Sequence, residues 1–321
     1  GCALYRDRPP HPVRVITMVS STDAATDVKQ VSMFNLADDT ARRRWRWLHS
    51  LWRDKKAVAG LIILLTMILA AIFASLITPY DPRAQEYTFL EAPSWTHPFG
   101  TDDLGRDLFT RIIYGARISL FVGLTTVALS LMAGVLMGLL AGYYGGWIDN
   151  LIMRYIDLQW AFPNFIIAVY LVAVFGTGLS NVIVAVSLAF LDDFARITRG
   201  MVLSIREQEF VLAARSIGMT DRRMLLRHIL PSAAAPIIVL ATVSVSYAIL
   251  AEATLSFLGL GVQPTTPTWG LILSDARSFF SRAWWLAVFP GLAIMLTVLS
   301  LNFFGDALRD ILDVREYKEE R

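Results

Sequence analysis

Cysteine and lysine are scarce in this chain. Cys2 is the single cysteine among 321 residues, which excludes a disulfide framework and any cysteine-based metal site. Four lysines occur and each follows a residue other than glycine, so the Gly-Lys-Ser/Thr loop that binds nucleotide phosphates is absent from this sequence. The formal net charge of +2 favours neither nucleic acid nor an acidic partner. If nucleotide hydrolysis drives this protein, another chain must bind the nucleotide.

Histidine is also rare, and its few copies form no catalytic or metal-binding pattern. The four histidines fall on widely separated segments: His11, His49, His97 and His228. Neither a nucleophile–base pair nor a second metal ligand stands at a useful spacing from them. We therefore expect no catalytic residue and no metal site, and we expect His228 to be structural or to face a partner protein.

Apolar residues, by contrast, are abundant and come in long runs. They make up 55% of the chain, the mean hydropathy is +0.52, and the runs approach the roughly 20 residues that cross a bilayer as a helix. The sequence therefore predicts an all-α integral membrane protein with six transmembrane helices. These cover residues 57–78, 118–141, 148–175 with a bend near Pro163, 181 onward through Asp192, Asp193, Arg196 and Arg199, 231–258, and 284–304.

Polar segments surround and connect these runs. A mobile tail (1–40), a basic segment (41–56) and a short tail (316–321) flank a transmembrane domain (57–315), which contains a long loop (79–117) and a hairpin (207–230). The 41–56 segment is patterned as a basic interfacial helix, although a basic flank that anchors the next span explains it equally well. In the second span, Gly134-xxx-Gly138 predicts close packing against another helix.

The distribution of arginine and lysine predicts the orientation. These residues are densest in the amino-terminal flank and in the connection between the fourth and fifth spans, and they are diluted in the long loop. Because basic residues accumulate on the cytoplasmic side of membrane proteins, both termini and the hairpin are predicted to be cytoplasmic. The long loop is then extracytoplasmic.

The hairpin carries the most informative pattern of the chain. Four apolar residues spaced i, i+3, i+4 and i+7 form one stripe on its first helix: Phe210, Ala213, Ala214 and Ile217. Glu209 begins this helix, where the helix dipole favours an acid, and Gly218 follows it at a sharp turn that calls for positive φ. Thr220 is the expected N-cap of the second helix, which Pro231 is expected to separate from the fifth span.

This pattern resembles the EAA coupling motif of ABC-importer permeases, in which a cytoplasmic ATPase grips the membrane subunit. The resemblance implies that the ATPase-contacting residues are Glu209, Ala213, Ala214, Gly218, Arg222, His228 and Pro231. Two short helices around Ala214-xxx-Gly218 also resemble a DNA-binding helix-turn-helix. Their attachment to membrane spans within a few residues argues against that alternative.

Further motifs extend the resemblance over residues 45–315. They are His97-Pro-Phe-Gly-Thr-Asp-Asp-Leu-Gly-Arg-Asp107, Leu255-Ser-Phe-Leu-Gly-Leu-Gly261 with Trp269-Gly270, and Asn302-Phe-Phe-Gly-Asp-Ala-Leu-Arg-Asp310, in which Ala307 stands where the family usually has glycine. Together they are similar to the C-type permease subunit of dipeptide and oligopeptide importers, a family that also handles glutathione and nickel complexes. The resemblance implies a type I ABC importer permease fold in the bacterial plasma (inner) membrane.

The resemblance also implies a mechanism and partners. The chain would form half of a path for peptides and work by alternating access, together with a second permease subunit, two cytoplasmic ATPases that bind ATP and Mg, and an extracytoplasmic solute-binding protein. It would sit in membrane lipid and would itself bind neither cofactor nor nucleic acid. A self-sufficient secondary transporter and an intramembrane enzyme are the alternatives. We find neither the inverted repeats that would favour the first nor the paired catalytic groups that would favour the second.

Five residues in or beside the spans are candidates for the translocation path or its gate: Asp192, Asp193, Arg196, Glu252 and Trp269. For the fourth span, the alternative is an internal ion pair, because Arg196 follows Asp192 by four residues and Asp193 by three. Glu252 is expected either to meet a substrate amine or the second permease, or to pack against a neighbouring loop. The loop that ends at Trp269 and the long loop are the expected docking and gating surfaces.

Overall fold

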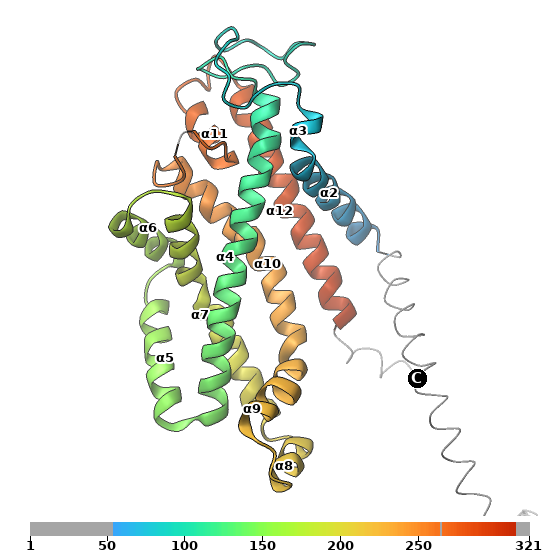
Figure 1. Ribbon diagram of the computed structural model, residues 1–321, viewed down its shortest axis with the longest axis vertical. Coiled ribbons are helices and arrows are strands. Elements are labelled where there is room, and N and C mark those ends of the chain that lie inside the picture. Colours follow the sequence, from blue (N-terminus) through green and yellow to red (C-terminus); the bar gives the residue numbers. More distant parts are fainter. Residues whose placement is uncertain (1–53, 264, 313–321) are drawn as a thin grey trace, which may run out of the picture. The chain divides into compact units, whose positions relative to one another are not determined.

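The computed structural model describes residues 54–263 and 265–312, all within one compact unit, Leu51–Arg321. The predicted tails at 1–40 and 316–321, and residues 41–53 of the predicted interfacial helix, lie outside the described residues. Within the described ranges the regular structure is helical, and the long helices α4, α7, α10 and α12 run lengthwise (Figure 1). We call the end that carries residues 78–107 the loop end and the end that carries α8 and α9 the hairpin end.

Four helical runs in the described ranges are long and apolar enough to cross a membrane. They are α2 (Lys55–Ile72), α4 (Leu108–Tyr144), the run Asp221–Phe257 that contains α10 (Leu230–Phe257), and α12 (Trp285–Leu312). A fifth span is formed if α5 (Gly146–Trp160) and α6 (Asn164–Phe175), bent by 91°, are counted together. The predicted bend near Pro163 is thereby confirmed, because this proline stands at the break between the two helices.

The predicted fourth span is helical but is not among these candidates. Helix α7 (Leu179–Ile205) runs without a break through its four charged residues, as the sequence predicts. Those charges follow its apolar first half, so any stretch of α7 long enough to span a bilayer includes Asp192, Asp193 and Arg196. By length and composition, the part of the chain that the structure describes therefore gives four spans and a bent fifth, where the sequence predicted six.

Helix α4 packs against α7 through a row of glycines. A Cβ atom on Gly138 would lie 2.7 Å from the Cβ of Thr198, and one on Gly142 would lie 2.8 Å from the Cβ of Val202. A Cβ on Gly134 would collide with the backbone carbonyl of Leu191. The close approach predicted from Gly134-xxx-Gly138 is therefore confirmed, since only the absence of a side chain lets the two backbones come this near.

Helix α4 begins ten residues earlier than predicted. Asp107 caps it, because its Oδ2 accepts a hydrogen bond from the N–H of Thr110 at 2.7 Å. Arg111 and Arg117, which the sequence analysis placed in the loop, instead lie within α4, and their guanidinium groups find partners in the protein. Arg117 donates to the carbonyls of Ala71 and Ile72 at the end of α2, at 3.0 and 2.9 Å, and Arg111 pairs with Asp102. The predicted loop of 79–117 shortens accordingly, and α3 (Ala74–Ile77) precedes it.

The second arm of the hairpin does not form the separate helix that the sequence predicted. Helix α9 (Asp221–Met224) passes through a π-helical turn, η1 (Leu225–Ile229), directly into α10. Pro231 is the second residue of α10 and does not interrupt the run. In the π turn, the N–H of Leu230 donates to the carbonyl of Leu225. This wider turn accommodates the proline ring and its lack of an N–H donor, so the helix continues.

Candidate functional site

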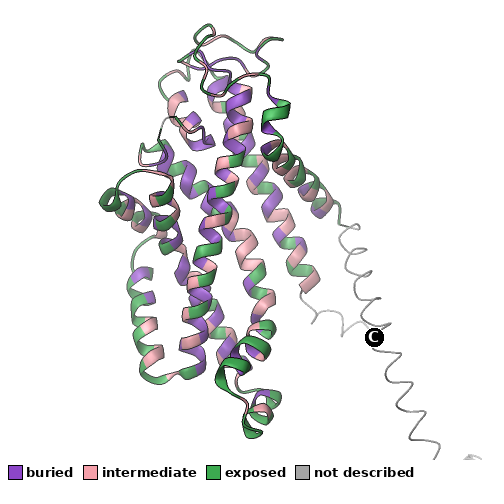
Figure 2. Ribbon diagram, in the orientation of Figure 1, coloured by how far each residue is buried: buried purple, intermediate pink, exposed green. Residues whose placement is uncertain are grey.

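The hairpin at residues 207–230 presents an uncovered apolar surface. Helix α8 (Glu209–Ser216) begins at Glu209 as predicted, and Gly218 adopts the expected positive φ, +81°. Three residues of the predicted stripe point outward: Phe210 is 43% exposed, Ile217 is 82% exposed and Ala213 is exposed. The fourth, Ala214, is half-buried and packs against a buried cluster. Figure 2 shows that α8 is largely exposed, in contrast to the buried residues along α4 and α7. The arrangement leaves the small and apolar face of α8 free to meet another surface.

The opposite face of the hairpin is anchored in the protein. Val211 is 1% exposed and belongs to a buried cluster with Val202 and Ile205 of α7. From the second arm, Met224 and Ile229 are fully buried in the same cluster. The hairpin therefore packs on the end of α7, so that a force on α8 acts on the helices behind it.

Tyr143, at the last turn of α4, contacts both arms of the hairpin. Its hydroxyl donates a hydrogen bond of 2.6 Å to Oδ1 of Asp221, the first residue of α9. The guanidinium of Arg215, near the end of α8, lies 5.4 Å from the centre of the tyrosine ring, within the range of a cation–π contact. Tyr143 itself is buried. One side chain thus joins α4 to the hairpin on either side of the Gly218 turn.

Two arginine–aspartate pairs join α7 to α5. Arg199 donates to both carboxylate oxygens of Asp149, at 2.6 and 2.7 Å. This is the bidentate pairing that a planar guanidinium group forms with a carboxylate. Arg196 donates to Asp157 at 3.1 Å and lies 4.1 Å from the ring centre of Trp160. The internal pair predicted between Arg196 and the acids of its own helix does not form, because Arg196 reaches across to α5, where Asp157 and Trp160 lie three residues apart.

The two acids in the middle of α7 have different surroundings. Asp192 is fully buried, and neither of its carboxylate oxygens has a hydrogen-bond partner among the described residues. Asp193 is half-buried. A role for either residue on a translocation path remains a prediction.

Glu252 and Trp269 are internal residues at the loop end. The N–H of Trp269 donates to the Ser119 hydroxyl at 3.3 Å, and that hydroxyl donates to Glu252 at 3.4 Å, while Ser256 donates to the other oxygen of Glu252 at 2.8 Å. The indole N–H of Trp269 donates to the carbonyl of Ile112 at 3.0 Å. Glu252 thus bonds to Ser119 of α4 and to Ser256 of its own helix, and Trp269 fixes α11 (Trp269–Ala276) to α4. The predicted roles of Glu252 stay predictions. A gating role for Trp269 stays a prediction.

The remaining predicted coupling residues lie along the second arm. Arg222 and Pro231 are exposed and His228 is half-buried. Sequence reasoning missed Tyr143 and Asp221, which lie 78 positions apart and have no shared spacing that could reveal the contact. The only available signal was the position of Tyr143 at the end of an apolar run.

Family models match most of the described chain. Residues 134–316 match the binding-protein-dependent transport system inner membrane component. Residues 43–93 match the N-terminal TM domain of oligopeptide transport permease C.

Relatives extend the similarity over almost the whole length. The dipeptide transport system permease protein DppC of Alkalihalophilus pseudofirmus is 48% identical over 276 residues, 85% of this chain and 91% of the relative. The glutathione transport system permease protein GsiD of Pectobacterium atrosepticum is 44% identical over 282 residues, 87% of this chain and 93% of the relative.

A solved structure shares the fold. The inward-facing MetNI methionine ABC transporter matches with a TM-score of 0.53 and 18% identity, over 64% of this chain and 97% of that chain. Together with the exposed hairpin and the apolar helices, these similarities identify a multi-pass membrane protein. The chain belongs to the family of binding-protein-dependent transport system inner membrane components, and within it to the permeases similar to oligopeptide transport permease C.

Proposed function

We propose that this chain is one of two permease subunits of an ATP-driven peptide importer in the bacterial inner membrane. The relatives named for dipeptide and glutathione transport support short peptides as the substrate class. The proposed complex contains a second permease, two cytoplasmic ATPases and an extracytoplasmic solute-binding protein. In this arrangement α7, the predicted fourth span, completes the set of six spans and is shielded from lipid by its contacts with α4, α5, α6 and α10. Both termini lie in the cytoplasm.

The hairpin geometry is the observation that carries the proposal. Its apolar stripe is exposed on one side, while its other side is packed on α7 and joined to α4 through Tyr143. A surface of this kind suits a partner that must grip a membrane protein and move it. Because the sequence contains no phosphate-binding Gly-Lys-Ser/Thr loop, the proposed energy source lies in the partner ATPases.

The way the helices are joined supports alternating access as the proposed mechanism. When ATP closes the ATPase dimer, the hairpin moves with it and carries α4 and α7, which the glycine row holds together as one body. The Arg199–Asp149 pair extends that body to α5. The ATPases shift the equilibrium between inward- and outward-open states only if they contact the hairpin differently in the two states.

Replacing Ile217 by aspartate tests the proposed ATPase surface. This side chain is 82% exposed, so the substitution should leave the fold intact while placing a charge in the proposed contact. We expect the tagged assembled transporter, solubilised in mild detergent, to lose its co-purifying ATPases. The matched control is Phe89→Asp, the same kind of change at an exposed residue of the loop end, which should retain them. Full ATPase recovery with Ile217→Asp would contradict the proposal.

Replacing Tyr143 by phenylalanine tests the connection between hairpin and helices. The change removes the hydrogen bond to Asp221, worth about 1.5–3 kcal/mol for a charged acceptor, and keeps the ring that Arg215 contacts. We expect ATPases to stay bound but more ATP to be hydrolysed per peptide transported, measured in proteoliposomes. Tyr144→Phe is the control, because Tyr144 is about half exposed and packs edge-on against Tyr143. An unchanged ATP-to-peptide ratio in Tyr143→Phe would remove Tyr143 from the coupling route.

A further inference from the structure

An exposed ion pair lies where α5 ends beside α7. Nη2 of Arg196 donates to Oδ1 of Asp157 at 3.1 Å, and the guanidinium carbon of the same arginine lies 4.1 Å from the ring centre of Trp160. The side chain of Arg196 is 38% exposed and that of Asp157 is 59% exposed, and Trp160 is also exposed. We call these three residues the α5–α7 charge cluster. A cation, an anion and an aromatic ring therefore share one open surface of the protein.

The cluster lies at the level of an apolar run. A Cβ atom on Gly138 of α4 would meet Ala195 and Thr198 of α7, which flank Arg196 in the sequence. Gly138 belongs to the apolar run 118–141 of α4, one of the candidate spans. Charge that faces lipid at such a depth is costly. The open side of the cluster therefore faces water or another protein.

The backbone beside the cluster leads to the same conclusion. Helices α5 and α6 meet at 91°, and the residues of the break, Ala161, Phe162 and Pro163, are exposed. Figure 2 shows exposed residues along both helices. Backbone that departs from a helix within a span is tolerated only where protein covers it or where it lines a water-filled cavity. The break thus also requires water or a partner at this surface.

A comparison with a neighbouring ion pair favours water. Arg199 holds Asp149 with two hydrogen bonds, of 2.6 and 2.7 Å, whereas Arg196 holds Asp157 with one, of 3.1 Å, and is more exposed. A protein that covered the second pair would remove water from both charges. That cost is repaid only when the geometry is excellent and further hydrogen bonds are present. The Arg199 pair is suited to holding α7 against α5, and the Arg196 pair to exchanging partners in water.

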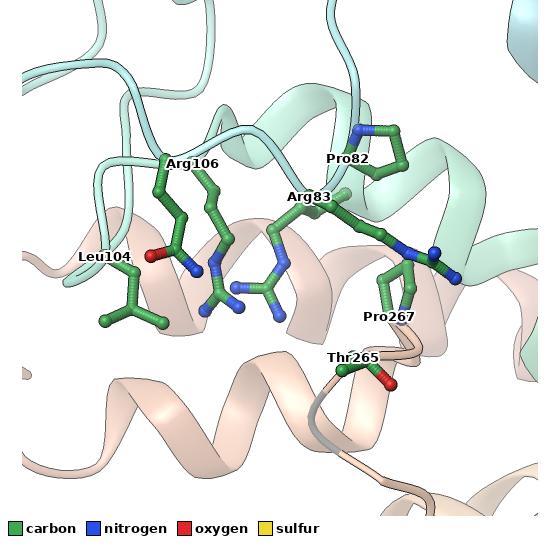
Figure 3. A pocket seen from close by; sticks show the side chains of 8 residues that line it. Pro82, Arg83, Leu104, Arg106, Thr265 and Pro267 are labelled. Carbon is green, nitrogen blue, oxygen red and sulfur yellow. The ribbon is translucent and has the colours of Figure 1, made fainter.

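The arginines at the loop end offer a poorer site for a free carboxylate. Figure 3 shows Arg83 and Arg106 beside a small cavity between the long loop and the segment that precedes α11, and Arg111 also lines it. Arg106 and Arg111 are buried and already bonded to Asp102, and Asp275 lies 3.4 Å from each. A carboxylate would have to displace these internal acids. In the α5–α7 charge cluster, by contrast, both the acid and the base are exposed.

We propose that the α5–α7 charge cluster lines a water-filled path for the peptide and binds the two charged ends of the peptide as it passes. The inference rests on the proposed function and adds a substrate contact to it. Arg196 takes the peptide carboxylate in place of Asp157, and Asp157 takes the peptide ammonium group. The exchange replaces one ion pair by two, so each charge keeps a partner. Trp160 and Phe162 supply apolar surface for the side chains of the peptide.

A peptide that lacks one charged end tests this contact. In proteoliposomes with ATP and the purified solute-binding protein, uptake of dialanine would be compared with uptake of dialanine amide, which has no carboxylate. For Arg196→Gln we expect the ratio of the two rates to fall about tenfold, because glutamine has no charge to hold a carboxylate. Arg282→Gln, at an exposed arginine between α11 and α12, should keep the wild-type ratio. The binding protein is the same throughout, so a changed ratio is due to this chain.

Thiol labelling tests the water-filled surface independently of uptake. In a Cys2→Ser background, Ala161→Cys places a thiol in the exposed break beside the cluster. In nanodiscs that hold the assembled transporter, we expect a charged, membrane-impermeant methanethiosulfonate to modify this thiol. Ile62→Cys, at an exposed residue of the apolar helix α2, is the control. It should stay unmodified, because hydrocarbon excludes the charged reagent.

The outcomes separate this inference from the function on which it rests. An unchanged ratio in Arg196→Gln would overturn the substrate contact and leave the importer assignment standing. If one compound is not taken up and the ratio cannot be measured, Arg196→Lys decides, because it keeps the charge: wild-type dialanine uptake in this variant, with reduced uptake in Arg196→Gln, supports the contact, and any other result overturns it. An unmodified Ala161→Cys would mean that the second permease covers the break, which overturns the inference. Failure of the wild type to take up dialanine with ATP and binding protein would overturn the proposed function itself.

Discussion

Gly138→Leu is expected to prevent α4 and α7 from assembling. Even a single Cβ atom at this position would lie 2.7 Å from the Cβ of Thr198 and 2.5 Å from the carbonyl oxygen of Ala195. The remaining atoms of leucine have no space, and neither backbone can retreat, because Gly134 and Gly142 make similar contacts on both sides. Overpacking of this kind costs about 1–3 kcal/mol or more, a large part of the stability of a typical domain.

The effect can be measured as loss of the folded species in detergent. We expect little monodisperse protein in size-exclusion chromatography of Gly138→Leu, and an intermediate loss for Gly138→Ala. The matched control is Gly200→Ala on α7, where a Cβ would meet nothing within 4 Å. That change should be neutral or stabilise slightly, since alanine is favoured over glycine in a helix by about 1 kcal/mol. Normal yield and thermal stability of Gly138→Leu would show that the two helices are not packed in this way.

Gly218→Val is expected to reduce transport strongly while leaving the protein folded. Gly218 has φ +81°, a conformation that costs a β-branched residue about 1–3 kcal/mol, and a Cβ there would meet nothing within 4 Å. The penalty therefore falls on the backbone of the turn and not on packing. Distortion of the turn would displace α8 from α9, so we expect peptide uptake to fall on the order of tenfold.

Two further measurements and one control variant distinguish a local effect on the turn from a general loss of folding. Membrane insertion and elution in size-exclusion chromatography should match the wild type, because the hairpin base is anchored independently by Val211 and Met224. Gly218→Asn is the control, since asparagine tolerates positive φ, and it should keep most of the uptake. Wild-type uptake by Gly218→Val would mean that the geometry of this turn does not matter for coupling.

The sequence was most informative where structure depends on neighbouring residues. The apolar runs, the bend at Pro163, the positive φ of Gly218 and the start of α8 at Glu209 all follow from local composition and local backbone preference. Close packing at Gly134 and Gly138 was also predictable, although its partner helix was not. Such features need no knowledge of which segments meet in space.

Contacts between distant segments decided the rest. Arg196 could pair with an acid of its own helix, but tertiary packing gives it Asp157, 39 positions away. Arginines at 111 and 117 seemed to mark a loop, and the structure extends α4 through both because Asp102 and the end of α2 satisfy them.

By itself, the sequence determined that this is a helical membrane protein, where its apolar helices lie, and that a glycine-hinged hairpin links two of them. Only the tertiary structure decided that Pro231 is absorbed by a π turn and that Tyr143 joins α4 to both arms of the hairpin. The same is true of the three arginines that line one cavity. The physical reason is that backbone propensity and hydropathy act over a few residues, whereas hydrogen bonds and ion pairs form between whichever groups the packing of the helices brings together.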